Sequence, residues 1–386
     1  MAGDNLVKGT VADGFDSVRT AFASVAADDA SDYAAQLTVY RHGELVVDLW
    51  TGPEIDGDSL TGVFSASKGA AALIIALLVQ DGALDLDRKV SYYWPEFAAQ
   101  GKQEILLREL LSHQAGLVGA HNGFTTEELA DDRIIAERLA SQRPYWRPGA
   151  AFGYHALVVA ALSGEVVRRV TGQTIQENFV KRVREERAVD FHLGLPASEE
   201  FRYLDVQPIL ATPERLAALA ARATDANSLS GIAFNRNHPR NPDLWTLPNI
   251  REIRALGPAS FGGVASARGL ARMYATAISS VDSMEPLLTS ETAAAFGQIQ
   301  SVGYDLVLGE HKAFAVGFSA TAELYPVLGQ GAFGHSGAGG QLGFADPRSG
   351  LAYGYNRRRF AFPPGGAAPE NKRLVGAVCA TASKCR

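Results

Sequence analysis

The sequence predicts a mixed α/β fold, in which one antiparallel β-sheet flanked by helices carries an inserted, mainly α-helical lobe. Three observations point to it: strand-like segments on both sides of His42-Gly43-Glu44, a helical middle, and strand-like segments that return late in the chain. Strands at both ends with helices between them indicate one sheet built from the two terminal regions. We expect a sheet domain of residues 1–80 and 257–386 and a mainly helical domain of residues 81–256.

The first 80 residues contain the signals of a helix, a hairpin and a second helix, in that order. Phe15, Val18, Phe22 and Val25 recur at helical spacing. Segments 35–41 and 45–50 are rich in β-branched and aromatic residues and flank a glycine turn, which predicts an antiparallel hairpin. Residues 66–79 are Ala-rich and almost wholly apolar, which is typical of a buried helix.

The remaining elements follow from the same periodicities. Helices are expected at 104–115, 126–141, 156–171, 174–187, 213–223 and 370–382. Strands are expected at 313–318, 340–344 and 351–355.

Composition and charge exclude several classes of protein. The chain has 386 residues, 47% of them hydrophobic, and a formal net charge of −6, which is typical of a globular enzyme and argues against a nucleic-acid partner. The longest apolar run, residues 70–79, is too short to cross a membrane. The first residues lack the basic and apolar regions of a secretory signal, so we expect a cytoplasmic location. Cys379 and Cys385 lie close to the C-terminus, and we expect no structural disulfide.

Ser65 and Lys68 form an S-x-x-K pattern at the start of the expected buried helix. Residues three apart on a helix share one face, so the ammonium can reach the hydroxyl. A serine becomes a good nucleophile when a base takes its proton or a cation stabilises its alkoxide, and apolar surroundings lower the pKa of a lysine. An N-cap serine followed by a lysine is the structural alternative, since the pattern is common by chance.

Two further segments carry candidate chemistry. Trp146 opens a Pro/Gly turn that leads to Tyr154, and a phenol near a lysine and a serine can be held partly as phenolate and act as a general base. Residues 334–340 are rich in glycine and precede an expected strand, so their N–H groups can complete an oxyanion hole. Core packing of the tyrosine and a plain glycine turn are the alternatives.

The order Ser-x-x-Lys, then Tyr, then His-Ser-Gly resembles the serine β-lactamase-like superfamily. The sequence is most similar to the family VIII carboxylesterases, which look like class C β-lactamases. The resemblance covers most of the chain and includes segments 84–87, 93–97, 110–117 and 265–268. It implies a β-lactamase-like fold and hydrolysis of small carboxylic esters through an acyl-enzyme, with the active site between the sheet and helical lobes.

The resemblance also implies a role for each motif residue. Ser65 is the implied nucleophile, and Lys68 is implied to lower its pKa and to relay protons. Tyr154 is implied to act as base toward Ser65 and as acid toward the leaving alcohol. The backbone N–H groups of Ser65 and Ala338 are the implied oxyanion hole, and Trp146 is a candidate substrate-binding wall.

Two departures from the class C pattern bear on the substrate. His335, Ser336 and Gly337 stand where β-lactamases have Lys-Thr-Gly, so they are expected to contact the substrate. A histidine is mostly neutral near pH 7 and lacks the charge with which the lysine holds a lactam carboxylate. Ala156 replaces the asparagine of Tyr-x-Asn and removes an amide. Both changes favour simple esters as substrates, and we expect at most weak β-lactam hydrolysis.

Other functions remain open at this point. A β-lactamase or peptidase, an amide-oligomer hydrolase and an acyltransferase would all use the same acyl-Ser65. A catalytically inactive scaffold is disfavoured, because Ser65, Lys68 and Tyr154 are all present. Residues 334–338 also resemble the nucleophile elbow of α/β-hydrolases, but no histidine follows His335, as that fold's chain order requires.

No cofactor and no metal are expected. Three of the histidines, His113, His121 and His155, lack the paired spacing of a zinc site. The expected partner is a small-molecule ester, and the oligomeric state is open.

Overall fold

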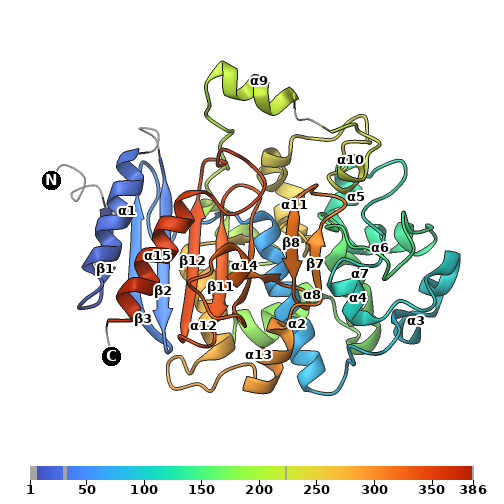
Figure 1. The fold of residues 1–386 in the computed structure, drawn as a ribbon, viewed down its shortest axis with the longest axis horizontal. Coiled ribbons are helices and arrows are strands. Elements are labelled where there is room, and N and C mark those ends of the chain that lie inside the picture. The colour runs from blue at the N-terminus through green and yellow to red at the C-terminus, as the bar shows by residue number, and fades with distance from the viewer. Residues whose placement is uncertain (1–6, 29–32, 222–223, 385–386) are drawn as a thin grey trace.

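The computed structural model describes residues 7–28, 33–221 and 224–384. Its main sheet has nine strands in the order β1-β3-β2-β12-β11-β10-β9-β8-β7, and every neighbouring pair is antiparallel. The N-terminal strands, blue in Figure 1, therefore lie beside the C-terminal ones, drawn in orange and red. This confirms the predicted antiparallel sheet built from both ends of the chain.

The strands of this sheet are β1 (Val7–Val11), β2 (Ala35–Arg41), β3 (Glu44–Thr51), β7 (Ser301–Tyr304), β8 (His311–Phe314), β9 (Ser319–Ala320), β10 (Phe333–Ser336), β11 (Leu342–Asp346) and β12 (Leu351–Arg357). A small second sheet contains β4 (Thr61–Gly62), β6 (Val264–Ala265) and β5 (Phe191–His192). The predicted hairpin is β2 and β3, and its turn places His42 and Gly43 at positive φ. Strands β1, β7 and β10 were not expected from the sequence.

Helices cover both faces of the main sheet. Helices α1 (Asp16–Asp28) and α15 (Glu370–Ala382) pack against each other on one face, in front of the strands in Figure 1. Helix α12 (Ala267–Ile278) packs on the other face, against β2, β11 and β12. Gly354 on β12 permits this close approach, since a Cβ there would lie 2.4 Å from the Ala267 carbonyl oxygen.

The other helices are mostly short. They are α2 (Ser67–Gln80), α3 (Val90–Tyr93), α4 (Leu107–Leu111), α5 (Thr126–Ala130), α6 (Asp132–Ala140), α7 (Val159–Thr171), α8 (Ile175–Phe179), α9 (Pro213–Ala221), α10 (Leu229–Ala233), α11 (Arg251–Leu256), α13 (Ser290–Gly297) and α14 (Thr321–Leu324). Short segments of 3₁₀ or π helix are η2 (Phe64–Ala66), η3 (Pro95–Gly101), η4 (Val180–Arg184), η5 (Ala197–Arg202) and η6 (Leu244–Asn249).

Three expected helices differ from those observed, each for a local reason. The helix expected at 126–141 is two helices, because Asp131 has extended φ/ψ and its side chain caps α6 through the N–H of Arg133. The helix expected at 104–115 is only α4, since His113 has a φ of 65°. The helix expected at 174–187 is α8 followed by a π turn, η4.

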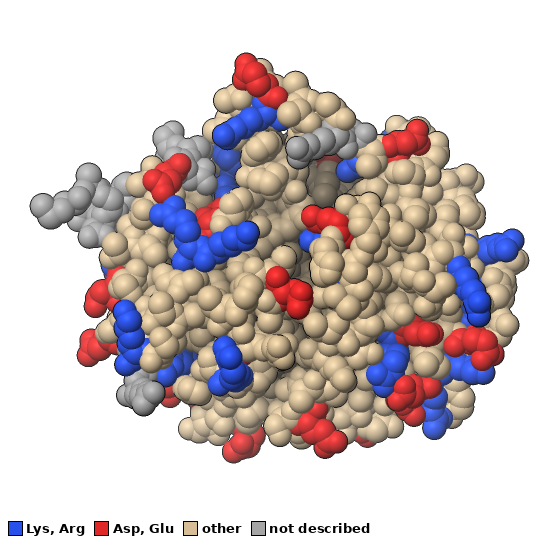
Figure 2. Space-filling view, viewed as in Figure 1, with Lys and Arg blue, Asp and Glu red and all other residues tan. Residues whose placement is uncertain are grey.

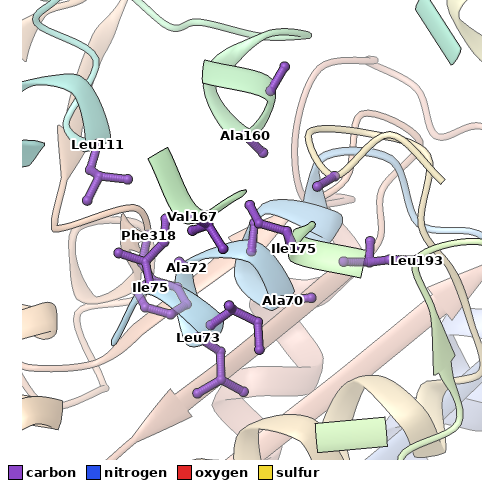
Figure 3. Close-up of a cluster of buried hydrophobic side chains, with 14 of the residues drawn as sticks. Ala70, Ala72, Leu73, Ile75, Leu111, Ala160, Val167, Ile175, Leu193 and Phe318 are labelled. Atoms are coloured by element: carbon purple, nitrogen blue, oxygen red, sulfur yellow. The ribbon is translucent and has the colours of Figure 1, made fainter. Parts of the chain in front are cut away.

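Helix α2 forms the centre of the larger hydrophobic core. Its residues from Ser67 to Leu78 are buried, as expected for an almost wholly apolar helix. Figure 3 shows side chains from other elements around it, including Leu111, Val167, Ile175 and Phe318. The helix that carries Lys68 is therefore held on all sides by apolar packing.

Figure 2 shows both acidic and basic side chains on this face, with several basic ones gathered at its upper left. Within the described ranges, no helix combines the length and the hydropathy that a membrane span requires. Cys385 and residues 1–6 lie outside the described residues, so the expectations about a disulfide and a secretory signal stay predictions. The division into two domains also stays a prediction.

Candidate active site

Ser65 and Lys68 lie at the junction of η2 and α2. Ser65 is the central residue of η2, and Lys68 is in the first turn of α2. Lys68 Nζ lies 3.1 Å from Ser65 Oγ, which is hydrogen-bond distance. Phe64, directly before the serine, has a φ of 48°, an uncommon backbone conformation for a bulky residue. A strained turn thus presents the hydroxyl to the lysine.

The Lys68 side chain is buried, with 2% of its surface exposed. Its Nζ also donates to the carbonyl oxygens of Ala156 at 2.6 Å and Ser260 at 2.8 Å. Desolvation lowers the pKa of Lys68 well below its usual value of 10.5. A neutral amine, which can accept a proton, is therefore much more accessible here than on a surface lysine.

Tyr154 packs beside this pair. Lys68 Nζ lies 4.9 Å from the centre of its ring, and the ring stacks between Phe314 and His335. Burial raises the pKa of Tyr154 above its usual value, the nearby Asp305 carboxylate adds to the rise, and a hydrogen bond with Ser65 opposes it. The phenolate suggested by the sequence is thus disfavoured, and the resting side chain is a neutral phenol.

Strand β10 and the turn after it bring residues 335–338 to the site. His335 is 4% exposed, and its Nδ1 lies 2.8 Å from the carbonyl oxygen of Ser336. Burial lowers the pKa of His335 to about 3, with the Lys68 charge adding to the effect. The imidazole is therefore neutral at pH 7, so it carries no charge where the β-lactamases have a lysine. Since a carbonyl only accepts, the proton is on Nδ1.

A cleft of about 420 Å³ opens over these residues. Its lining from the predicted site consists of Ser65, Tyr154, His335, Ser336 and Ala338. Further lining residues are Phe234, Arg236, Leu244, Leu308, Glu310, His311, Lys312, Ala313, Phe314, Ser319, Ala320, Glu323, Leu324, Pro364, Gly365 and Gly366. The predicted nucleophile and tyrosine thus line one cavity, and the predicted lysine is buried beside the nucleophile.

Two predicted substrate-binding residues do not line this cleft. The indole N–H of Trp146 donates to the Ala151 carbonyl, and its ring packs edge-on to His155. Gly337 is packed under the η2 turn, because a Cβ there would lie 2.4 Å from the Val63 carbonyl oxygen. Both residues shape the walls from behind. Ala156 is also buried and meets Lys68 through its backbone carbonyl.

Two residues near Tyr154 were not singled out by the sequence as parts of the site. Asp305 follows β7 and accepts the Tyr154 N–H at 3.2 Å, and His113 packs edge-on to the Tyr154 ring. Each lies far from Tyr154 in the sequence, so no local spacing connects them. For Asp305, the sequence offers one indication: an acidic residue stands alone in a largely apolar segment, Val302 to Leu308.

The chain is similar to known proteins over most of its length. The family model Beta-lactamase matches residues 25–377. The chain is 32% identical to Esterase/beta-lactamase LipL of Mycobacterium tuberculosis over 348 residues, which cover 85% of this chain and 77% of that protein. It is also similar to the solved structure of EstA from Arthrobacter nitroguajacolicus Rue61a, with a TM-score of 0.90, 43% identity, and coverage of 97% and 98% of the two chains.

A second solved structure is described as that of a family VIII carboxylesterase, with a TM-score of 0.85 and 32% identity. The match covers 98% of this chain and 100% of the other. The resemblance inferred from the three motifs is therefore confirmed, and the chain belongs to the beta-lactamase family.

Proposed function

We propose that this protein is a serine hydrolase that cleaves small carboxylic esters through an acyl-enzyme on Ser65. The observation that carries the proposal is the placement of Lys68 Nζ, 3.1 Å from Ser65 Oγ and bonded to two backbone carbonyls. Carbonyl oxygens only accept, so a neutral amine gives its two N–H groups to Ala156 and Ser260. Its lone pair is then left for the Ser65 hydroxyl proton.

Acylation follows from this arrangement. Ser65 Oγ attacks the ester carbonyl carbon while its proton passes to Lys68 Nζ. The bond between the acyl carbon and the alcohol oxygen then breaks, and Tyr154 gives its phenol proton to the departing alcohol. Lys68, whose Nζ lies 4.9 Å from the Tyr154 ring centre, then holds the proton that restores the phenol.

Deacylation reverses the roles. A water molecule attacks the acyl-Ser65 carbonyl, and the Tyr154–Lys68 pair takes its proton. The bond to Ser65 Oγ breaks, the carboxylic acid leaves, and the serine hydroxyl is restored. No cofactor takes part in either half.

The backbone N–H groups of Ser65 and Ala338 are proposed as the oxyanion hole. Both residues line the cleft. In the part of the chain that the structure describes, neither N–H donates to another protein group. Two free donors beside the nucleophile suit the negative oxygen of a tetrahedral intermediate.

The position of the β-lactamase lysine favours an ester over an anionic lactam. Neutral His335 offers no charge for a carboxylate there, and Lys312 is paired with Glu310 at 2.8 Å. Arg236, the other cation of the lining, donates to the Thr224 hydroxyl and packs over the Phe234 ring. Leu308, Phe314 and Leu324 supply apolar contact for an acyl or alcohol group. β-Lactam hydrolysis is the second candidate, favoured by the name Esterase/beta-lactamase of the relative LipL. We also propose that the protein is cytoplasmic and that its chain divides into a sheet domain and a mainly helical domain.

Turnover of two substrate classes tests this proposal. Purified protein is assayed with short p-nitrophenyl esters and with a chromogenic cephalosporin, and the Ser65→Ala variant serves as the blank. We expect ester turnover that depends on Ser65 and far exceeds lactam cleavage. Faster cleavage of the cephalosporin than of every ester would assign the protein as a β-lactamase instead.

A further inference from the structure

Three consecutive backbone N–H groups around Tyr154 are each bound by an acceptor from elsewhere in the chain. The Gly153 N–H donates to the His113 carbonyl at 3.0 Å. The Tyr154 N–H donates to Asp305 Oδ1 at 3.2 Å, and the His155 N–H donates to His113 Nδ1 at 3.1 Å. The tyrosine lies on an irregular segment before α7, so these bonds replace the support that a helix or strand would give.

Asp305 makes the contact to Tyr154 itself. Its surface is 0% exposed, and the same Oδ1 accepts the N–H groups of Val307 and Leu308, each at 2.8 Å. Within the described ranges, Oδ2 is buried without a hydrogen-bond partner. Burying a carboxylate in this position is unfavourable. Removing it from water costs free energy, and hydrogen bonds to only one of its two oxygens do not compensate for that cost. If Asp305 only capped the turn at Val307 and Leu308, its carboxylate would not need to bind the Tyr154 N–H as well.

The turn that Asp305 caps also packs against the tyrosine segment. The Leu306 N–H donates to the Phe152 carbonyl at 3.1 Å. A Cβ added at Gly153 would lie 3.0 Å from a Val307 methyl carbon, so the Val307 side chain packs closely against the backbone of this glycine. Beyond them, Leu308, Glu310, His311 and Lys312 line the cleft. Asp305 thus connects the proposed proton donor to the β7–β8 hairpin that forms the cleft wall.

We propose that Asp305 is a positioning residue for Tyr154: its buried carboxylate oxygen fixes the backbone of the tyrosine and so places the phenol between Lys68 and the leaving group. This inference rests on the proposed esterase function. It predicts that Oδ1, and not the negative charge, is the part of Asp305 that catalysis requires. Catalytic geometry of this kind is sensitive to displacements of about 1 Å, which can cost on the order of 10²-fold in rate.

Three substitutions separate the acceptor from the charge. Asp305→Asn keeps an acceptor oxygen in place and removes the charge, whereas Asp305→Glu keeps the charge and displaces the oxygen. Asp305→Ala removes both. We expect kcat to stay near the wild-type value in the Asn variant and to fall about 10- to 100-fold in the Glu and Ala variants, with KM little changed.

Asp346 supplies a matched control. It is also buried, and its carboxylate accepts the N–H groups of Gly329 and Arg348, both at 3.2 Å, and the Ser349 hydroxyl at 2.6 Å. It lies at the far end of β11 and does not line the cleft. Asp346→Ala is expected to lower the melting temperature as Asp305→Ala does, without the loss in kcat.

A second readout compares leaving groups. An ethyl ester needs a proton on its leaving oxygen more than a p-nitrophenyl ester does, so a displaced Tyr154 harms ethyl ester cleavage more. We expect the Ala and Glu variants to lose more activity on the ethyl ester. Should Asp305→Ala fail to fold, the Asn and Glu variants decide the question by themselves.

Each result supports or overturns the inference. Equal kcat values for Asp305→Glu and the wild type, or equal losses in Asp305→Ala and Asp346→Ala, would show that Asp305 only stabilises the fold. So would a loss that is the same for both ester types. Wild-type protein and Ser65→Ala are measured in the same assay, so absence of Ser65-dependent turnover would instead reject the proposed function.

Discussion

Lys68 Nζ donates to the backbone carbonyl of Ala156 at 2.6 Å, across 88 residues of sequence. Ala156 is the third residue of the motif that begins with Tyr154, so one short segment supplies both the phenol and an acceptor for the lysine. The small Ala156 side chain is buried and allows this approach. The lysine is therefore bound directly to the backbone of the segment that carries the tyrosine.

Replacing Lys68 by alanine should abolish most turnover. Without the buried amine, no group takes the Ser65 proton, and we expect kcat to fall by about 10²- to 10⁴-fold. Lys102→Ala is the matched control, because Lys102 is also fully buried and donates to two carbonyls, those of Ala99 and Gln142. Steady-state kinetics should show a loss only for Lys68; equal losses would mean that burial, and not base chemistry, is what Lys68 contributes.

Tyr154→Phe should keep the ring stacking and lose the proton transfer. We expect an unchanged fold and a kcat lowered by about 10²-fold or more, with a larger loss for alkyl than for p-nitrophenyl esters. Tyr353→Phe removes another buried phenol, whose hydroxyl donates to Asn371 at 2.7 Å away from the cleft. That control should retain its kcat. Full activity of Tyr154→Phe would rule out the phenol as the proton donor.

Ser67→Ala should weaken the turn that presents Ser65. The Ser67 hydroxyl donates to the carbonyl of Phe64, whose φ is positive, and accepts the Gly263 N–H at 2.8 Å. Its loss leaves the buried Gly263 N–H unpaired, at a cost of about 2 kcal/mol in the free energy of unfolding, while the Phe64 carbonyl keeps the Ser67 backbone N–H as a donor. Chemical denaturation measures that cost, and we expect kcat to drop about tenfold because Ser65 shifts.

The control for this prediction is Ser163→Ala. The Ser163 hydroxyl is buried too, but it donates to the Val159 carbonyl of its own helix, α7. It should therefore change stability less and kcat not at all. A Ser67→Ala variant as stable and active as Ser163→Ala would contradict the supporting role given to Ser67.

Stability should fall as the solution is acidified below about pH 6.5. Burial lowers the pKa of His155 to about 4 and that of His335 to about 3, from a usual value of 6.5. Between pH 6.5 and these values the unfolded chain binds protons that the folded protein does not, so each histidine lowers the free energy of unfolding by up to about 1.4 kcal/mol per pH unit. Denaturation midpoints at several pH values measure the slope.

His335→Gln isolates one of these contributions. Its unfolding free energy should depend on pH less steeply than that of the wild type, by about one proton over this window. A slope identical to that of the wild type would show that His335 takes up a proton in the folded state. In that case a cation would stand at the lysine position of the β-lactamases, and the argument against anionic substrates would be lost.

The sequence predicted those parts of the fold that have strong local periodicity. The β2–β3 hairpin, the apolar helix α2 and the terminal helices α1 and α15 agree with it. Strands β7 and β10 were missed because they are four residues long and contain glycine, so neither alternation nor length marks them. Their strand conformation comes from pairing with neighbours, which is not encoded locally.

The residues of the site also separate into those that local sequence patterns predicted and those that they did not. Ser65 and Lys68 share one helical turn, Tyr154 follows a Pro/Gly turn, and His335 stands near the start of a glycine-rich segment, so motif spacing pointed to all four. Asp305 and His113 act on Tyr154 only through long-range packing, and sequence spacing contains no trace of such contacts. Trp146 was expected at the substrate because of its size and position, but an indole next to a turn can equally pack behind the cleft wall, as it does here.

The central claim is that an ester acylates Ser65, and mass spectrometry of the trapped intermediate tests it most directly. The protein is mixed with an excess of a short p-nitrophenyl ester, quenched in acid, digested and mapped. We predict that the peptide containing Ser65 gains the mass of the acyl group in the wild type and not in Ser65→Ala. Ester hydrolysis without any adduct on that peptide, or an equal adduct in the Ser65→Ala variant, would contradict the account.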